Sequence, residues 1–205
     1  MTKTYALIEM IGVTKEYFGV PAIRQVDFNV EAGEIHALVG ENGARISTLT
    51  KIIPGATTPT RRVMRIKGRK ETLRNPSEAL RDGIAMVFQE TSLVPSMTVA
   101  QNLYLGHERL FNRLRGLNIA AQQFLQSLNF NVDPAATVAN LGAAQKQMVE
   151  IARAVLQKAG LIIFDEPTAD LTPEEKRYFF ARVQRLKVSG VAIVFTSHAV
   201  EEAPA

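Results

Sequence analysis

The stretch Ile35-His36-Ala37-Leu38-Val39 followed by Gly40-Glu41-Asn42-Gly43-Ala44-Arg45-Ile46-Ser47-Thr48 decides the fold class of this chain. A short apolar strand that runs straight into a glycine-containing loop and then into a helix is typical of a phosphate-binding loop, whose pattern is G-x-x-x-x-G-K-S/T. The spacing is kept, but Arg45 stands at the second glycine and Ile46 at the lysine. The stretch therefore predicts the architecture of such a loop with two of its important positions replaced.

Strands and helices alternate on both sides of this loop, which favours an α/β core with a mainly parallel sheet. Apolar runs predict strands, and apolar residues at helical spacing predict helices. The expected strands are 35–39, 63–66, 84–88, 161–164 and 191–196. The expected helices are 47–53, 145–157 and 173–186, together with a helical stretch over 99–128 that a loop at 113–118 interrupts. Thr172 and Pro173 are expected to cap the helix at 173–186, and Pro54 is expected to stop the helix at 47–53.

Composition limits the class of protein. The chain has 205 residues, 46% of them hydrophobic, a net charge of +4 and no cysteine. This length suits one domain with a sizeable core. The absence of cysteine excludes disulfides and thiolate metal sites. No long apolar run and no secretory signal are present, so a cytoplasmic protein is expected.

A basic segment follows the first helix and leaves two interpretations open. One is a binding patch for nucleic acid or anionic lipid. The other, which we favour, is the solvated face of strands, because no aromatic residue interleaves the charges as a stacking platform requires. The charged residues are Arg61, Arg62, Arg65, Lys67, Arg69, Lys70 and Arg74.

Two carboxylates, Asp165 and Glu166, follow the apolar run 161–164. Open α/β sheets bind ligands at the carboxyl ends of their strands. There the first carboxylate suits Mg²⁺, and the second suits a base that orients or deprotonates a water attacking a phosphate. An acidic turn without function is the alternative, and the preceding apolar run with the following Pro167-Thr168 favours the functional interpretation.

At these residues the chain resembles the ATPases of ATP-binding-cassette (ABC) transporters. Phe164-Asp165-Glu166-Pro167-Thr168-Ala169 is similar to their Walker B segment and D-loop, and Val87-Phe88-Gln89-Glu90 to their Q-loop. Leu141-Gly142-Ala143-Ala144-Gln145 stands where the signature L-S-G-G-Q is expected, and Thr196-Ser197-His198 resembles the switch-histidine loop. Tyr17 matches the aromatic residue that stacks on adenine. The resemblance extends over essentially the whole chain.

The resemblance implies ATP and Mg²⁺ as cofactors and assigns roles to residues. The implied catalytic residues are Glu166, His198 and Gln89. The implied Mg²⁺ ligands are Ser47, Gln89 and Asp165. The implied nucleotide contacts are Tyr17, Gly40, Asn42, Gly43, Ala44, Arg45, Ile46, Ser47, Thr48, Gln89 and Asp165.

The wording of 40–44, 100–106 and 165–175 is similar to one branch, the ATPases of bacterial monosaccharide importers of the ribose, galactose and xylose type. That branch implies a P-loop NTPase-type sheet core, an N-terminal antiparallel β subdomain and an inserted α-helical subdomain at about 90–158. We expect residues 1–205 to form one such nucleotide-binding domain, corresponding to the first of two cassettes and truncated at its C-terminus.

The same branch implies partners and a location. The implied partners are membrane-spanning permease subunits, a second nucleotide-binding cassette and, indirectly, a periplasmic sugar-binding protein. Nucleic acid is not expected. The implied location is the cytoplasm, peripheral on the inner face of the plasma membrane.

The departures from the family pattern predict impaired hydrolysis. Ile46 removes the ammonium that bridges the β- and γ-phosphates, and such a loss costs about 3 kcal/mol, or 10²–10³ in rate. Arg45 is one position too early to replace it. The signature segment lacks its serine and both glycines. Two alternatives therefore remain: a non-enzymatic cassette that pairs with or regulates an active partner, and a soluble ABC protein acting on ribosomes or nucleic acid.

Overall fold

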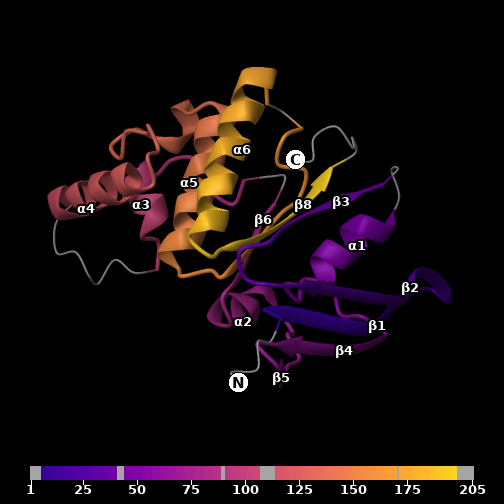
Figure 1. The fold of residues 1–205 in the computed structure, drawn as a ribbon. Coiled ribbons are helices and arrows are strands. Elements are labelled where there is room, and N and C mark those ends of the chain that lie inside the picture. The colour runs from indigo at the N-terminus through magenta and orange to yellow at the C-terminus, as the bar shows by residue number, and fades with distance from the viewer. Residues whose placement is uncertain (1–5, 41–43, 89–90, 107–113, 170, 198–205) are drawn as a thin grey trace.

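The computed structural model describes residues 6–40, 44–88, 91–106, 114–169 and 171–197, with the backbone alone at 44, 45 and 114. Within these ranges the strands form two four-stranded sheets, with orders β2-β1-β4-β5 and β3-β8-β7-β6. Figure 1 shows the two sheets and the helices that pack around them. The predicted α/β fold, with an N-terminal antiparallel sheet and a parallel core sheet, is confirmed.

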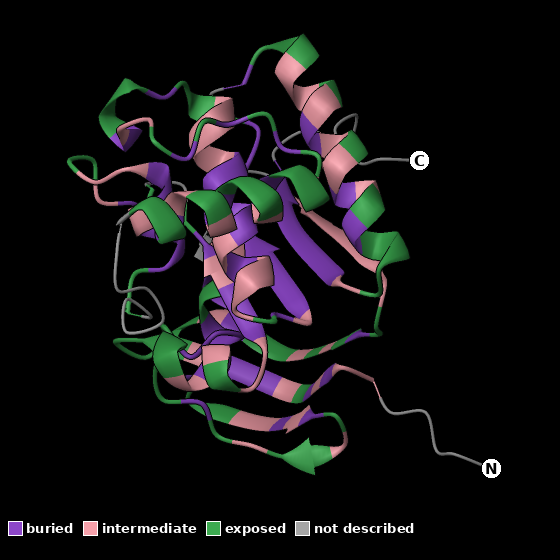
Figure 2. Ribbon diagram, turned by 90° about the vertical axis from the view of Figure 1, so that its left-hand side faces the viewer, coloured by how far each residue is buried: buried purple, intermediate pink, exposed green. Residues whose placement is uncertain are grey.

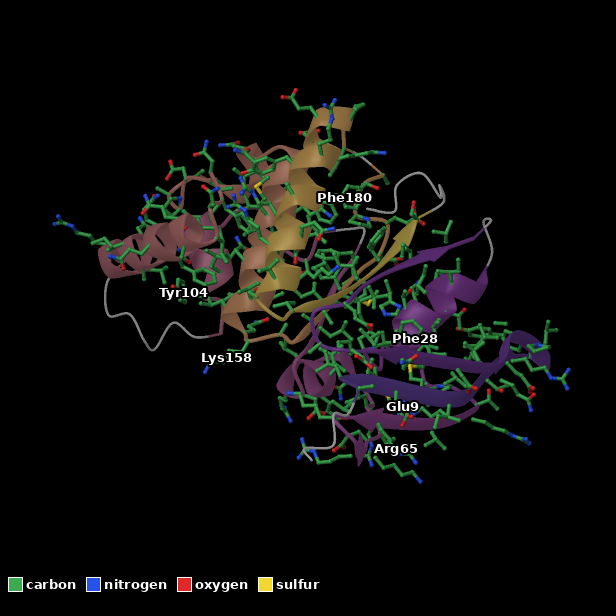
Figure 3. The ribbon with its side chains drawn as sticks, viewed as in Figure 1. Glu9, Phe28, Arg65, Tyr104, Lys158 and Phe180 are labelled. Atoms are coloured by element: carbon green, nitrogen blue, oxygen red, sulfur yellow. The ribbon has the colours of Figure 1, made fainter. Side chains whose placement is uncertain are left out.

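The first sheet is antiparallel and is built from β1 (Ile8–Tyr17), β2 (Val20–Val30), β4 (Arg61–Ile66) and β5 (Arg69–Lys70). One face is buried, because Ile8, Met10 and Met64 are at most 1% exposed. On the neighbouring positions Arg65 Nη1 donates to Glu9 Oε2 at 2.7 Å, and Figure 3 labels both residues in this sheet. The alternation of apolar and charged residues fixes which face meets the core.

The second sheet is parallel and is built from β3 (Ile35–Val39), β6 (Ile84–Val87), β7 (Leu161–Phe164) and β8 (Ala192–Ser197). Every residue of β7 and β8 is buried, as expected for parallel strands covered on both faces. Figure 2 shows these strands as the buried centre of the molecule. Successive residues of β7 belong to different cores: Leu161 and Ile163 face the first sheet, while Ile162 and Phe164 face the helices.

Helices cover both faces of the parallel sheet. The first core receives residues of α1 (Ala44–Ile52) and α2 (Pro76–Arg81). The second core receives residues of α3 (Val99–Leu103), α4 (Leu114–Ser127), α5 (Ala143–Leu156) and α6 (Pro173–Val188). A short 3₁₀ turn, Val138–Asn140, precedes α5. The strands and helices expected from the sequence are present, with ends that shift by a few residues.

The predicted loop at 113–118 is wrong from residue 114 onward, because α4 begins at Leu114. Leu117, Ala121 and Leu125 recur every four residues and are at most 6% exposed. Their burial against the second core stabilises a helix across a stretch whose Gly116 and polar residues suggested a break.

The predicted stop after the first helix is present, although Pro54 does not interrupt any helical turn. α1 ends at Ile52, and the N–H of Gly55 donates to the carbonyl of Ile52 at 3.0 Å. Gly55 has φ +72, and a Cβ there would lie 3.0 Å from Leu73 Cβ. Pro54 therefore lies in the turn that follows α1, where the cost of an interior proline does not apply.

Candidate functional site

The site is built on the carboxyl edge of the parallel sheet. β3 leads into the loop at Gly40, and β7 leads into Asp165. β8 lies between them, with Val39 paired to Ser197 and Phe164 paired to Phe195. The two strand ends are thus two strand spacings apart, about 10 Å. Neighbouring ladders bring the loop and the acidic pair to one edge, as the sequence pattern predicts.

A single hydroxyl on β8 positions the acidic pair. Thr196 Oγ1 donates to Asp165 Oδ1 at 3.1 Å and accepts from the N–H of Glu166 at 2.8 Å. The N–H of Asp165 donates to the carbonyl of Val87 on β6 at 3.1 Å. Thr196 is only 5% exposed, so its hydroxyl makes these bonds away from bulk water. Sequence reasoning quoted Thr196 within a motif but gave it no role.

Glu166 has a left-handed backbone conformation, with φ +50. For a residue other than glycine this conformation costs about 1 kcal/mol or more. Strained backbone of this kind clusters at functional sites, where surrounding contacts hold it in place. The hydrogen bond from the Glu166 N–H to Thr196 is one such contact.

A cavity of about 260 Å³ lies beside the acidic pair. Asp165 and Glu166 line it, and so do Lys146 and Gln147 from the first turns of α5 and Phe88 from the end of β6. The cavity therefore has carboxylates from the sheet edge and an ammonium and an amide from the helix. Such a lining suits a polar ligand that carries both donors and acceptors.

The loop residues do not offer a triphosphate what the pattern predicts. A Cβ placed on Gly40 would lie 2.6 Å from Ile46 Cδ1, so the Ile46 side chain lies against the backbone of Gly40. Thr50 Oγ1 lies 3.3 Å from the carbonyl oxygen of Ile46 and 3.2 Å from that of Ser47, within reach of donating to both. A phosphate oxygen needs N–H or cationic donors, and Ile46 presents a methyl group. The fit of the described loop residues to phosphate is therefore poor.

Oxygen ligands suited to Mg²⁺ are present in Ser47, at the first turns of α1, and in Asp165. Thr48 beside Ser47 is 4% exposed. Among the described residues, however, no group of three or more His, Cys, Asp and Glu side chains has the arrangement to hold a metal ion. A Mg²⁺ ion here would depend on these two residues together with ligands that the nucleotide or water supplies.

Tyr17 lies at the end of β1, where it pairs with Val20 of β2. Its side chain is 43% exposed, and Lys15 Nζ lies 4.8 Å from the centroid of its ring. A second cavity, of about 420 Å³, opens close by between β2 and α1, but Tyr17 is not among the described residues that line it. The ring is accessible at the margin of the site.

A buried glutamate that sequence reasoning missed lies on the other side of the first cavity. Glu150 of α5 is 4% exposed and accepts hydrogen bonds from Thr91 Oγ1 at 2.9 Å and from the N–H of Ser92 at 2.7 Å. Arg153 Nη2 donates to Glu150 Oε2 at 2.8 Å and also to Ser92 Oγ. A carboxylate between the apolar positions Val149 and Ile151 was the available signal, because charged residues are rarely buried without partners.

The signature segment forms the start of α5. Gly142 is the residue before the helix, and its N–H donates to Gln145 Oε1 at 3.3 Å. The helix therefore begins two residues earlier than the expected 145–157. Four of the expected site residues, Asn42, Gly43, Gln89 and His198, lie outside the described residues, as do the side chains of Ala44 and Arg45.

Comparison with known proteins places these features in a family. The family model described as "ABC transporter" matches residues 23–169. The chain is 48% identical over 199 residues to the ribose import ATP-binding protein RbsA 1 of Rubrobacter xylanophilus. It is 40% identical over 205 residues to a putative ribose/galactose/methyl galactoside import ATP-binding protein of Agrobacterium fabrum.

These relatives are longer proteins. The matches cover 96% and 98% of this chain but only 40% and 41% of the relatives. A solved structure, the ADP conformation of MJ1267, an ATP-binding cassette of an ABC transporter, has the same fold with a TM-score of 0.83. It is 23% identical, and the match covers 97% of this chain and 84% of that one. In the parts of the chain that the structure describes, no helix has the length and apolarity needed to cross a membrane.

Proposed function

Since the chain belongs to the ABC transporter family, we propose that it is the ATP-binding-cassette module of a bacterial importer for a monosaccharide of the ribose type. The observation that carries this proposal is the identity to ribose import ATP-binding proteins over nearly the whole chain. The order of the motifs supports it, and so does the position of Asp165 and Glu166 at the carboxyl end of β7.

In this proposal the sheet edge carries the nucleotide chemistry. Glu166 is the proposed base, with Gln89 and His198 as the residues that position water and phosphate. Ser47, Gln89 and Asp165 are the proposed Mg²⁺ ligands, and bound Mg²⁺ would neutralise phosphate charge. Thr196 supports the arrangement, because its hydroxyl holds the Asp165 carboxylate and the Glu166 N–H.

A second candidate is a cassette that binds nucleotide or a partner without hydrolysing ATP. The contact between Ile46 and Gly40 favours it, because an apolar group occupies the place from which a lysine ammonium would reach phosphate. The two candidates share their fold and partners and differ in turnover. We propose that hydrolysis by this chain is impaired.

The proposed partners are permease subunits, a second cassette and, through the permease, a periplasmic sugar-binding protein, with the chain peripheral on the cytoplasmic face of the membrane. A third cavity, of about 260 Å³, supports a permease contact. Phe88 and Leu105 line it, and each is 38% exposed. Phe88 directly precedes Gln89, the residue whose family role includes sensing the membrane subunit.

ATP turnover by the purified chain tests the catalytic part of the proposal. The comparison variant carries Arg45→Gly with Ile46→Lys, which restores the loop pattern. We expect turnover by the unmodified chain to be lower by about 10²–10³, the usual cost of losing one preorganised phosphate ligand. Adding Glu166→Gln to the repaired variant should abolish the gain. Equal turnover by the unmodified and repaired chains would contradict the proposal.

Co-purification with the permease subunits tests the proposed partnership. Phe88→Asp with Leu105→Asp should reduce recovery of the permease, because both changes place charge on an apolar contact. Ile119→Asp is the matched control, since Ile119 is 53% exposed and lies on α4 away from that cavity. Equal recovery with both variants would exclude this surface as the permease contact.

A further inference from the structure

The cavity between β2 and α1 has a lining unlike that of a phosphate site. It measures about 420 Å³, within the range of small-molecule sites. Its lining is mostly apolar, and Arg24 is the only charged residue among the described lining residues. These residues are Pro21, Ala22, Ile23, Arg24, Val26, Leu38, Ile46 and Leu49.

Ile46 belongs to two places at once. Its side chain lines this cavity, and its Cδ1 lies against Gly40, the first residue of the loop. The residue that should contribute a cation toward phosphates therefore extends the apolar wall of the neighbouring cavity. Apolar surface of this kind favours a flat, weakly polar ring system and gives nothing to a charged oxygen.

Tyr17 and Val20 extend the same surface beyond the cavity. They form a pair at the end of the β1–β2 ladder, next to Pro21, and are 43% and 68% exposed. An exposed aromatic ring beside an apolar cavity suits stacking with a nucleobase. The base and ribose thus meet apolar and aromatic residues, while the phosphates meet a loop without its lysine.

We propose that this chain recognises the nucleoside part of an adenine nucleotide at the β2–α1 cavity and is nearly indifferent to the number of phosphates. The inference rests on the proposed nucleotide binding and deepens it. Adenosine, AMP, ADP and ATP are expected to bind with affinities within about fivefold, because no described cation faces the β- and γ-phosphates to add the roughly 10–100-fold of a charge-assisted hydrogen bond. Arg24 is exposed, so its contribution is small and the same for AMP, ADP and ATP.

Isothermal titration of the full chain with the four ligands, in the presence of Mg²⁺, tests this inference. Ile46→Lys restores the cation and should make ATP bind at least about tenfold more tightly than adenosine. Ile46→Met is the matched control, because methionine has a long unbranched side chain like lysine but no charge. It should leave the four affinities as similar as in the unmodified chain. A thermal melt of each variant checks that it is folded.

Three results would overturn the inference. One is a preference of tenfold or more for ATP over adenosine by the unmodified chain. Another is an Ile46→Lys variant with no steeper preference than Ile46→Met. In both cases nucleotide binding itself stands. The third is an unmodified chain that binds none of the four ligands, which contradicts the proposed nucleotide binding as well.

Discussion

At the scale of single residues, Thr196 organises the acidic pair. Its hydroxyl bonds the side chain of Asp165 and the backbone of Glu166, and both bonds lie where Thr196 is almost fully buried. Without the hydroxyl, the N–H of Glu166 would lose a partner while its backbone stays in a left-handed conformation. A buried donor without a partner costs the free energy of its desolvation. Thr196 is therefore a positioning residue for Asp165 and Glu166.

Replacing Thr196 by valine, which has nearly the same shape, should lower the free energy of unfolding by about 1–3 kcal/mol, because it removes both hydrogen bonds and keeps the buried volume. Urea denaturation measures the change. Thr196→Ser is the control, since it keeps the hydroxyl and loses one methyl group, worth about 1 kcal/mol. If combining Thr196→Val with Asp165→Asn gave strictly additive losses, Thr196 would not act through Asp165.

At the scale of elements, α6 shows how a sequence signal defines the start of a helix. Thr172 Oγ1 accepts from the N–H of Glu175 at 3.3 Å, and Glu175 Oε2 accepts from the N–H of Thr172 at 2.9 Å. Pro173 occupies the first helical position, as predicted. This capping box satisfies two donors that a helix start leaves free. The hydrogen bonds from the backbone N–H and then the hydroxyl of Thr172 hold the pKa of Glu175 below its ordinary value.

The capping box predicts a pH-dependent contribution to stability. Because the folded-state pKa of Glu175 is lowered, its contribution is complete above the ordinary pKa of a glutamate and is lost as the pH falls through the lower, folded-state pKa. Thr172→Ala should raise the pKa of Glu175 toward its ordinary value, and loss of the cap should lower the free energy of unfolding by about 1 kcal/mol. A carbon-detected NMR titration of the Glu175 carboxyl measures the pKa.

Thr172→Ser is the matched control for this prediction, because serine keeps the capping hydroxyl. It should leave the pKa of Glu175 lowered. If Thr172→Ala and Thr172→Ser titrated alike, the hydroxyl of Thr172 would not be a cause of the lowered pKa of Glu175.

At the scale of the whole molecule, Glu150 joins the helical part to the sheet part. It lies on α5, and its partners Thr91 and Ser92 follow the end of β6, 59 and 58 positions away along the chain. Arg153, one turn later on α5, bonds the same carboxylate. The segment after the expected Gln89 is thus tied to the helix that begins with the signature residues. A change in position of one of these segments would be transmitted to the other through this carboxylate.

Glu150→Leu should lower the free energy of unfolding by about 2–4 kcal/mol, because it leaves a largely buried arginine and the N–H of Ser92 without their acceptor. Glu150→Gln keeps an acceptor oxygen and should lose clearly less. Guanidinium denaturation of both variants, followed by circular dichroism, measures the difference. Equal stability of Glu150→Leu and the unmodified chain would show that the network does not hold the two parts together.

How well a feature is predicted from the sequence depends on how far apart its interacting residues are in the chain. The strand at 161–164 and the cap at Thr172 were predicted because each is written in consecutive residues. The loop at 113–118 was wrong because burial of Leu117 outweighed local signals for a break. The roles of Thr196 and Glu150 were missed, since each depends on partners at least 30 positions away.

The sequence by itself determined the kind of protein, through the order of its motifs, and the loss of the loop lysine at Ile46. Both are properties of consecutive residues, which act through hydrogen bonds and side-chain spacing within a few positions. Only the tertiary structure decided where the side chain of Ile46 lies, against Gly40 and in the wall of the β2–α1 cavity. It also decided which hydroxyl holds the acidic pair. Such contacts arise when packing brings distant segments together, so no local pattern specifies them.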